Sequence, residues 1–377
     1  MKAKIPLEAK KVFDTLQQNG ARIYIVGGFV RDYFLGNKAQ KIDIDVEVHQ
    51  ITALKLIEVL SQFGKVDCIG QQFGIYKLKS IPYIDFSLPR IDNLIGKSHR
   101  DFNVTIDPNL SIEQTMKRRD FRCNSIYYDV QENQFIDDHQ GIDDIKNKII
   151  NVVDKKSFSE DPLRMLRMIQ MVSRFDFKVS DECLRMCQEM VDALQYLSHE
   201  RIEAEMNKFI DGKNRSLGLY YLEQLNIIKP KFLFDRKLFN QISDSKICFS
   251  YIKQAYEINC NFKFLNKYKM ELKIKEDDIN SYQNYMIFLK KLNHKINKED
   301  LKIGIEIFYP ELIQKYDQIV KQYGSEFKAP IVNGSDLIDW GLKPNQLFTL
   351  YLQQAYYMQL SGMNKEQIKE KLKEENK

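Results

Sequence analysis

The sequence is poor in the features that mark membrane, secreted and metal-cluster proteins. It has no long hydrophobic run, and residues 1 to about 20 predict an amphipathic helix with acidic residues, which is typical of neither a signal peptide nor a membrane anchor. Its six cysteines form no CxxC pair and no cluster with histidine, which indicates reduced thiols. We therefore expect a cytoplasmic protein with no membrane partner.

Net charge is also low. At +5 it does not by itself indicate a nucleic-acid partner, but the charges are unevenly distributed. Between Lys213 and Lys275 there are thirteen Lys or Arg against five Asp or Glu, interleaved with Phe, Tyr and Leu. This pattern suits a helical surface that lies on a phosphate backbone, and it equally suits Lys-rich helix faces in water. A length of 377 residues predicts two or three domains.

The most informative stretch runs from Tyr24 to Val48. It predicts a short strand, a Gly-Gly turn, one or two helical turns ended by Gly36, and a second strand. In the second strand Asp43, Asp45 and Glu47 alternate with apolar residues. The apolar residues are Ile42, Ile44, Val46 and Val48. Alternation places all three carboxylates on one face, where they repel each other unless something positive neutralises them. A divalent cation is the simplest candidate, and a solvated strand face is the other interpretation.

The Gly27-Gly28 pair lies directly after the first strand and before the short helix. Such a turn lets the backbone approach a phosphate closely. Arg31 adds a planar cation that is suited to phosphate oxygens. A phosphate-binding turn close to a pair of metal-binding carboxylates is what nucleotidyl transfer requires.

The strings GGFVRD, LG and DIDVE together resemble the catalytic signature of class II tRNA nucleotidyltransferases and their bacterial poly(A) polymerase relatives, in the polymerase-beta-like superfamily. The resemblance covers residues 20 to 230 densely and 325 to 362 loosely. It implies an α+β fold, with a nucleotidyltransferase head containing a mixed sheet and an all-helical neck, body and tail. We expect the head over residues 1–150, the neck over 151–215, and the body and tail over 216–377.

The resemblance also implies a magnesium site. Asp43 and Asp45 would hold one or two Mg²⁺ ions, with Gly27, Gly28 and Arg31 on the triphosphate. The relatives carry Asp or Glu at the place of Asp85 in DFSLPR, on the polar face of a strand expected over 83–88. Asp85 is therefore a candidate third carboxylate, although a lone acidic residue near a strand end is common.

Residues 117–121, KRRDF, resemble the RRD motif of the family. The resemblance implies that Asp120 contacts the ribose and Arg119 the triphosphate, which would select ribonucleotides. The family mostly continues with Thr-Ile-Asn-Ala, whereas this chain has Arg-Cys-Asn-Ser, so only Asn124 is retained in the nucleotide pocket.

A second distinctive segment is SEDPLRMLR, residues 159–167. Ser159 is a natural N-cap, and Pro162 is tolerated in the first turn of the helix that this predicts. Glu160 and Asp161 precede Arg164 by four and three residues, so the three side chains share a helix face.

The string EDPLRMLR is nearly the EDxxR motif of the family. The resemblance implies that Asp161 and Arg164 read the base in a Watson-Crick-like manner, that Glu160 orients Arg164, and that Arg167 belongs to the nucleotide-binding set. Each good bidentate pairing with a base is worth about 1–3 kcal/mol of discrimination.

Two further segments match the family less specifically, and one activity of some relatives is not expected. Arg201 and Glu205, in the ER motif of the neck, are expected to brace the neck helices as an i,i+4 pair. Residues 90–113 are polar without clear periodicity and resemble a flexible loop that is thought to help the switch from C to A addition; a mobile lid of another purpose fits as well. Only His294 lies beyond residue 200, so the HD phosphohydrolase activity of some relatives is not expected.

The resemblance implies template-independent addition of CMP and AMP, from CTP and ATP, to the tRNA 3′ end, with the helical half on the tRNA elbow. Alternatives are an enzyme that adds only CC or only A, a poly(A) polymerase, and an inactive RNA-binding scaffold. The sequence does not indicate an oligomeric state.

Overall fold

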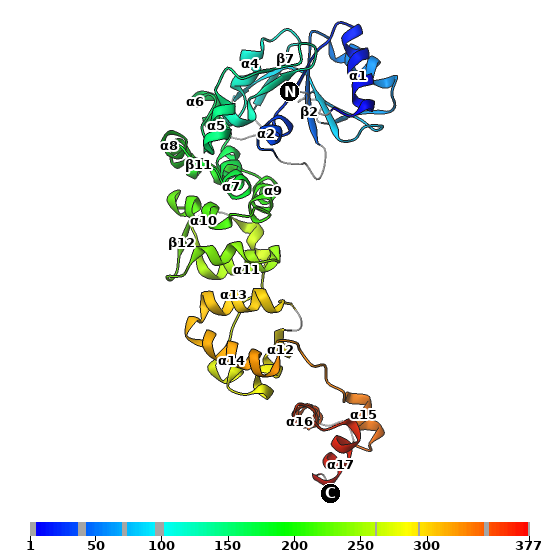
Figure 1. Ribbon diagram of the computed structural model, residues 1–377, viewed down its shortest axis with the longest axis vertical. Helices are drawn as coiled ribbons and strands as arrows, with labels where there is room; N and C mark the ends of the chain where they lie inside the picture. The colour runs from blue at the N-terminus through cyan, green and yellow to red at the C-terminus, as the bar shows by residue number, and fades with distance from the viewer. Residues whose placement is uncertain are drawn as a thin grey trace. The chain divides into compact units, whose positions relative to one another are not determined.

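The computed structural model describes residues 5–36, 43–69, 74–94, 102–260, 262–292, 295–342 and 347–375 (Figure 1). It divides the chain into two compact units. Unit 1 comprises Met1–Lys231 and Tyr256–Asn266, and unit 2 comprises Phe232–Ala255 and Lys267–Lys377. The predicted head and neck both lie in unit 1. The division of the chain into head, neck, and body with tail stays a prediction.

Unit 1 contains a seven-stranded sheet with the order β3-β4-β5-β2-β1-β8-β9. Its strands are β1 (Arg22–Val26), β2 (Ile44–His49), β3 (Val66–Ile69), β4 (Ile75–Leu78), β5 (Ile84–Ser87), β8 (Tyr127–Asp129) and β9 (Gln134–Ile136). The central strands β2 and β5 are parallel, whereas the other neighbours are antiparallel. The predicted mixed sheet is therefore confirmed, and the strands expected around Asp43–Val48 and over 83–88 are β2 and β5, each within two residues of its predicted place.

Helices pack on this sheet because their apolar stripes match its apolar face. The helices of the head are α1 (Leu7–Gln18), α2 (Gly28–Phe34), α3 (Ala53–Ser61), α4 (Ile112–Lys117) and α5 (Gly141–Asn147), with a 3-10 turn at Arg122–Asn124. The predicted leading helix is α1, and its Phe13 ring meets the Phe86 ring of β5 edge-on at 6.3 Å. On β1 and β8, Tyr24 and Tyr127 form a small buried cluster with Met116 of α4.

Residues 90–113 differ from the expectation of a loop without regular structure. Strands β6 (Arg90–Leu94) and β7 (Phe102–Ile106) pair in antiparallel register, and α4 begins at Ile112. Polar residues interrupt the apolar alternation of β6, which concealed the pairing, whereas apolar and polar residues alternate regularly in β7 and predict a strand there. Gly96, His99 and Arg100, which the predicted loop contains, lie outside the described residues.

After the head, unit 1 is helical. Its helices are α6 (Lys155–Ser159), α7 (Leu163–Phe175), α8 (Asp181–Met190), α9 (His199–Ile210) and α10 (Arg215–Gln224), with a 3-10 segment at Val191–Tyr196. α7 packs against α9 and α10. Two short ribbons accompany the helices: β10 (Ile149–Ile150) with β11 (Lys178–Val179), and β12 (Ile228–Pro230) with β13 (Tyr256–Ile258).

The start of α7 differs from the prediction. Ser159 does not cap this helix; it ends α6, whose N-cap is Asp154, and its hydroxyl donates to the Lys155 carbonyl at 3.0 Å. α7 begins only at Leu163, after Pro162. A proline disfavours helical geometry at the residue before it. The helix is therefore interrupted at Asp161, and two helices, α6 and α7, lie where the sequence predicted a single one.

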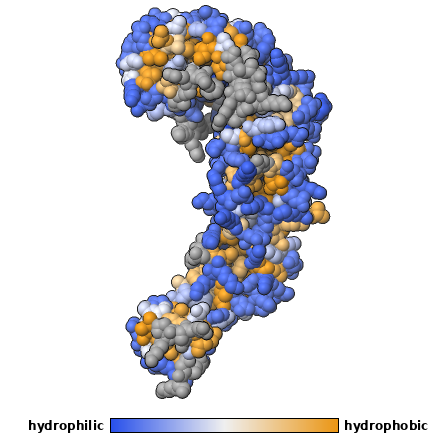
Figure 2. Space-filling view, turned by 180° about the vertical axis from the view of Figure 1, so that it is seen from behind, coloured by the Kyte–Doolittle hydropathy of each residue, from blue (hydrophilic) through white to orange (hydrophobic). Residues whose placement is uncertain are grey.

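Unit 2 is helical in its described residues. It contains α11 (Ser245–Ala255), α12 (Tyr282–Leu292), α13 (Lys298–Phe308), α14 (Ile313–Tyr323), α15 (Gly334–Asp339), α16 (Phe348–Leu360) and α17 (Lys365–Glu375). On the face shown in Figure 2, hydrophilic side chains cover most of α11 to α14, with hydrophobic residues visible between them. In the described part of the chain, no helix is long and apolar enough to cross a membrane.

Candidate active site

The turn between β1 and α2 touches the carboxylate strand directly. Gly27 has φ +73°, and a Cβ atom there would lie 3.0 Å from Oδ2 of Asp45 and 3.5 Å from Nη1 of Arg119. A side chain at this position would be strained and would also crowd the carboxylate. The glycine therefore brings bare backbone, an acid and a guanidinium together, as the phosphate-binding prediction requires.

Asp45 lies exposed on β2, in register with Asp85 of the parallel neighbour β5. The protein around the Asp45 carboxylate nevertheless removes part of its hydration and raises its pKa; the guanidinium of Arg119 opposes that rise, and the carboxylates of Asp43 and Asp85 add to it. A carboxylate that feels other carboxylates gains from a nearby cation, and oxygen donors suit Mg²⁺.

The three candidate metal ligands are not equivalent. Asp85 pairs with Lys77 of β4 at 2.6 Å, so part of its charge is already neutralised. Among the described residues, no three His, Cys, Asp or Glu side chains are grouped as a ready metal site. The donor chemistry of Asp43 and Asp45 fits a divalent ion, and the catalytic role predicted for Asp85 stays a prediction.

Glu47 differs from the other acids of its strand. Its side chain is fully buried, whereas the alternation had placed it with Asp43 and Asp45 on a face to be neutralised by a metal ion. Oε2 pairs with Arg118 at 2.8 Å, and Oε1 accepts from His49 Nε2 at 2.9 Å. These partners lower the pKa of Glu47 although burial opposes them. Protein cations therefore neutralise Glu47.

Arg119 is held on the same network. Its Nε donates to the Tyr127 hydroxyl at 3.2 Å, its guanidinium lies 5.1 Å from the centroid of the Tyr127 ring, and Nη2 is 3.7 Å from Glu47. The Tyr127 hydroxyl also donates to Glu47 Oε1 at 3.3 Å. β2 and β8 thus fix the direction of Arg119 through two buried side chains.

Asp120 is a buried hydrogen-bond centre. Oδ2 accepts from Arg167 Nε at 2.6 Å, and Oδ1 accepts from the Phe121 amide at 2.8 Å and from Asn124 Nδ2 at 3.1 Å. Nearby Arg167 and Arg164, together with the bonds from Asn124 and Arg167, outweigh the opposing effect of burial and lower the pKa of Asp120 to about 2. Asn124 Oδ1 in turn accepts from Arg31 Nη1 at 2.8 Å, which links Asp120 to the residue predicted to bind phosphate.

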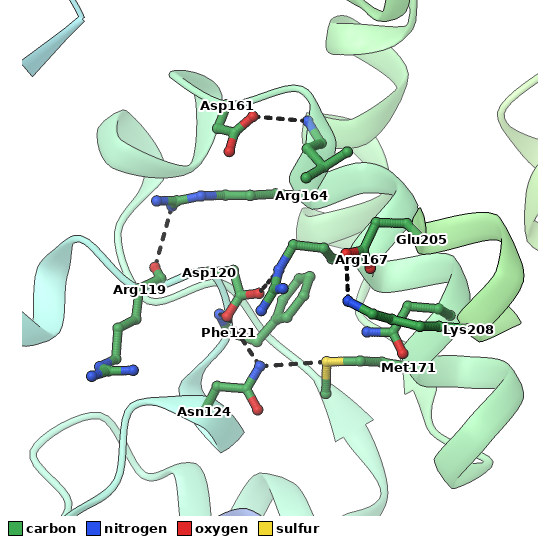
Figure 3. Close-up of polar contacts among 12 residues, drawn as sticks. Arg119, Asp120, Phe121, Asn124, Asp161, Arg164, Arg167, Met171, Glu205 and Lys208 are labelled. Atoms are coloured by element: carbon green, nitrogen blue, oxygen red, sulfur yellow. Dashed lines mark hydrogen bonds and ion pairs between the residues drawn. The ribbon is translucent and has the colours of Figure 1, made fainter. Parts of the chain in front are cut away.

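The residues predicted to read the base lie at the break between α6 and α7. Figure 3 shows the Arg164 side chain extended between Asp161 and the backbone of Arg119. Its guanidinium donates to the carbonyls of Arg118 and Arg119. Asp161 accepts from the Leu163 amide at 3.1 Å and from Arg201 at 3.0 Å.

The expected pairing within the neck is different in the structure. Arg201 and Glu205 were predicted to pair as i,i+4 neighbours. Instead, Arg201 reaches from α9 to Asp161, and the buried Glu205 pairs with Lys208 at 2.8 Å (Figure 3). The interruption between α6 and α7 brings Asp161 within reach of Arg201. An ion pair between two segments therefore forms in place of the expected i,i+4 pair within α9. Glu160 is half-buried beside this group.

These side chains line a cavity of about 450 Å³ in unit 1. Its lining residues are Gly27, Gly28, Arg31, Asp45, Arg90, Arg118, Arg119, Asp120, Asn124, Asp161, Leu163, Arg164, Arg167, Gln170, Arg174, Arg201 and Lys208. Nine of them are cationic and three are carboxylates, which favours a polyanionic ligand. Four predicted site residues are outside this lining: Asp43, Asp85, Glu160 and Glu205.

The sequence analysis missed five polar residues that line the cavity, namely Arg90, Arg118, Gln170, Arg174 and Lys208. Three of them carried a readable signal. Arg118 is the first arginine of the RRD motif. Gln170 and Arg174 lie three and seven residues after Arg167, so helical spacing places all three on one side of α7. The other two, Arg90 and Lys208, come from separate elements, and no sequence pattern joins them.

Two family models match the chain. Residues 23–151 match the poly A polymerase head domain, and residues 176–234 match the probable RNA and SrmB-binding site of polymerase A. Among curated proteins, the chain is similar to the CCA-adding enzyme of Staphylococcus aureus strain MRSA252, at 28% identity over 81% of this chain and 75% of that protein.

Solved structures have a similar fold. The Bacillus stearothermophilus CCA-adding enzyme in complex with CTP matches with a TM-score of 0.67 and 21% identity, over 98% of this chain and 97% of that one. The Thermotoga maritima CCA-adding enzyme complexed with tRNA-CCA also has a TM-score of 0.67, at 19% identity over 99% and 97% of the two chains. At these identities the likeness concerns the fold.

Proposed function

The chain belongs to the family of class II tRNA nucleotidyltransferases and bacterial poly(A) polymerases, and from that premise we propose that it adds CMP and AMP, from CTP and ATP, to the 3′ end of tRNA. The observation that carries this proposal is the cavity of about 450 Å³ in unit 1. It joins Asp45 and the Gly27-Gly28 turn to the Asp161–Arg164 pair, and its lining is mostly cationic.

In the reaction, the 3′-hydroxyl oxygen of the RNA forms a bond to the α-phosphorus. The bond between the α-phosphorus and the oxygen that bridges it to the β-phosphate breaks, and pyrophosphate leaves. Asp43 and Asp45 are the residues that would hold Mg²⁺. A bound divalent ion lowers the pKa of the attacking hydroxyl and neutralises charge on the phosphates. The backbone of Gly27 and the guanidinium of Arg119 lie beside Asp45, where they position the α-phosphate.

The family resemblance assigns the ribose to Asp120, and the hydrogen bonds of Asp120 are compatible with that role. Oδ1 already receives two donors, which fills its two lone pairs, whereas among the described residues Oδ2 receives only Arg167. One lone pair of Oδ2 thus remains for a ribose hydroxyl. Because the pKa of Asp120 is about 2, the group is ionised at neutral pH and acts only as an acceptor.

Base selection is assigned to Asp161 and Arg164. The carbonyls of Arg118 and Arg119 hold the guanidinium of Arg164, so its orientation is largely set before the nucleotide arrives. Arg201 and the Leu163 amide hold Asp161 in the same way. A fixed donor beside a fixed acceptor can discriminate bases by hydrogen bonding, which would make the protein its own template.

The basic helical segment between Lys213 and Lys275 is assigned to the tRNA elbow, and the cytoplasm is the expected location. The alternatives from the same family are addition of CC alone, of A alone, or of a poly(A) tail. An inactive RNA-binding scaffold is disfavoured because the carboxylates and the cationic cavity are both present.

The test is extension of tRNA transcripts that end in the discriminator base, in C, in CC or in CCA, resolved at single nucleotides. CTP and ATP are supplied separately and together, with Mg²⁺ and then with EDTA. The proposal predicts completion at CCA, arrest there, and no product in EDTA. Arrest at CC, action only on the CC end, or a long A ladder would each select one alternative, and no extension of any end would favour the scaffold.

A further inference from the structure

Helix α7 presents a row of polar side chains to the cavity beyond the residues already assigned. Arg164, Arg167, Gln170 and Arg174 all line the cavity, at intervals of three, three and four residues. This spacing keeps them on one side of the helix. At 1.5 Å per residue, Arg174 lies about 15 Å along the axis from Arg164. The cavity therefore has a cationic end far from the base-reading pair.

Among the residues that the structure describes, no carboxylate forms an ion pair with Arg174 within 4.0 Å. Its side chain is exposed to the cavity, and Nη1 donates to Oε1 of Gln170 at 3.1 Å; in the described part of the chain this neutral amide is its hydrogen-bond partner. Gln170 itself is 96% buried, at 4% relative exposure, so it is a rigid support. Partial burial and the nearby charge of Arg31 lower the pKa of Arg174.

Two of the three acids that act on Arg174, Asp32 and Glu205 but not Asp211, pair with other cations. Asp32 accepts from Arg31 at 2.7 Å, and Glu205 pairs with Lys208 at 2.8 Å. By contrast, Arg118, Arg167 and Arg201 of the same cavity each have a carboxylate partner within 3.0 Å. Arg174 thus remains a cation to which an incoming anion can bind.

The Phe175 ring connects Arg174 to the phosphate turn. The guanidinium of Arg174 lies 4.9 Å from the centroid of this ring, and that of Arg31 lies 4.2 Å from it. Arg31 in turn approaches the turn, since a Cβ atom on Gly28 would be 3.5 Å from its Nη2. Both cations stack on one aromatic side chain, at the end of the cavity next to the Gly27-Gly28 turn.

We infer that Arg174, supported by Gln170 and sharing the Phe175 ring with Arg31, is the subsite for the terminal phosphate of the incoming nucleoside triphosphate. The inference rests on the proposed function and deepens it. Along α7 the order is then base at Arg164, ribose at Asp120 with Arg167, and terminal phosphate at Arg174. The same site holds the outer phosphate of pyrophosphate as it leaves.

The test compares nucleotides that differ only in phosphate number. Full-length wild-type protein, Arg174→Gln and Arg174→Lys are titrated with CTP and with CMP by calorimetry, in Mg²⁺ buffer and without RNA. We expect Arg174→Gln to weaken CTP binding by about 10- to 100-fold and to change CMP binding by less than about twofold, with Arg174→Lys in between. Arg185→Gln is the matched control, because Arg185 is exposed on α8 and is not among the cavity-lining residues.

Equal losses for CTP and CMP, or unchanged CTP binding, would overturn the inference. A raised KM for tRNA with an unchanged Kd for CTP would overturn it too, because Arg174 would then hold a phosphate of the RNA. Wild-type protein that binds CTP but extends no tRNA would contradict the proposed function alone, and the CTP and CMP constants would still decide the subsite. Wild-type protein that does not bind CTP would contradict both.

Discussion

Units 1 and 2 bury polar side chains for different purposes. Of the fourteen buried polar or charged residues in the described chain, twelve lie in unit 1 and only Ser250 and Asp300 lie in unit 2. In unit 1, the buried Glu47 and Asp120 pair with arginines that line the cavity. In unit 2, Asp300 accepts the amides of Ser243 and Asp244 at 2.7 and 3.0 Å.

The difference separates two uses of a buried carboxylate. An acid whose oxygens accept from backbone amides ties two segments together, and those acceptor positions are then occupied and closed to a ligand. An acid paired with an arginine beside a cavity fixes the direction of a group that can still bind substrate. Neither burial nor an arginine partner marks a site by itself, since the buried Asp129 pairs with Arg22 at 2.7 Å outside the cavity lining; a partner that lines the cavity does.

The largest expected effect is at the carboxylate strand. Asp45→Asn should lower kcat for nucleotide addition by at least about a thousandfold, because it removes a charge that the metal site needs. tRNA binding, measured by gel shift, should change little. The control is Asp67→Asn, since Asp67 pairs with Lys79 at 3.5 Å and is not among the cavity-lining residues. Lost tRNA binding, or activity retained in Asp45→Asn, would refute the metal role.

The next effect concerns base choice. Arg164→Ala should reduce discrimination between CTP and ATP on a CC end by about 10- to 100-fold, because a bidentate contact to the base is lost. kcat/KM for each nucleotide, measured on the same tRNA, gives the ratio. A variant that keeps its preference between CTP and ATP while its overall rate falls would show that Arg164 stabilises the segment between α6 and α7 and does not read the base.

Acid sensitivity should be concentrated in unit 1. The pKa of Asp120 is about 2, below its ordinary value of 3.8, so its pairing contributes about 2 kcal/mol above pH 4. That stability is lost as pH falls toward 2, because the unfolded state then binds more protons. Hydrogen exchange of α7 peptides should show Asp120→Asn less protected than wild type at pH 6, with the gap in protection falling to about half by pH 3 and nearly closing at about pH 2. A gap independent of pH would contradict this linkage.

The smallest effect on activity should come from unit 2. Asp300→Ala should lower the free energy of unfolding by about 1–3 kcal/mol, because buried amides lose their acceptor. The only tryptophan of the chain, Trp340, lies in unit 2 and reports its unfolding by fluorescence. The Kd for CTP should be unchanged at a temperature where the variant is folded. Weakened CTP binding there would remove the distinction between the two units.

Much of the head was predictable because its signals are local. Strand alternation around Asp43 and Asp45, the Gly-Gly turn and the mixed sheet all follow from short patterns or from the family resemblance. All nine residues that were predicted to bind the nucleotide line the cavity: Gly27, Gly28, Arg31, Arg119, Asp120, Asn124, Asp161, Arg164 and Arg167. Their individual roles stay predictions.

The rest depends on contacts between distant segments. Alternation placed Glu47 beside Asp45 correctly, but its burial follows from Arg118 and Tyr127, more than seventy residues away. Arg201 pairs with Asp161 and not with Glu205, because Pro162 interrupts the helix predicted to begin at residue 160. Arg174 was not predicted, because the family motif EDPLRMLR ends at Arg167, although helical spacing places Arg174 on the same side of α7.

The most direct test of the central claim, that the cavity of unit 1 binds the nucleotide, is crosslinking of CTP to the full-length protein. Radiolabelled CTP is crosslinked by ultraviolet light without RNA, and the labelled peptides are identified by mass spectrometry. Label in the peptides that contain residues 118–124 and 161–174, displaced by unlabelled CTP and ATP, is the result expected. Displaceable label confined to residues 267–375 of unit 2 would contradict the account.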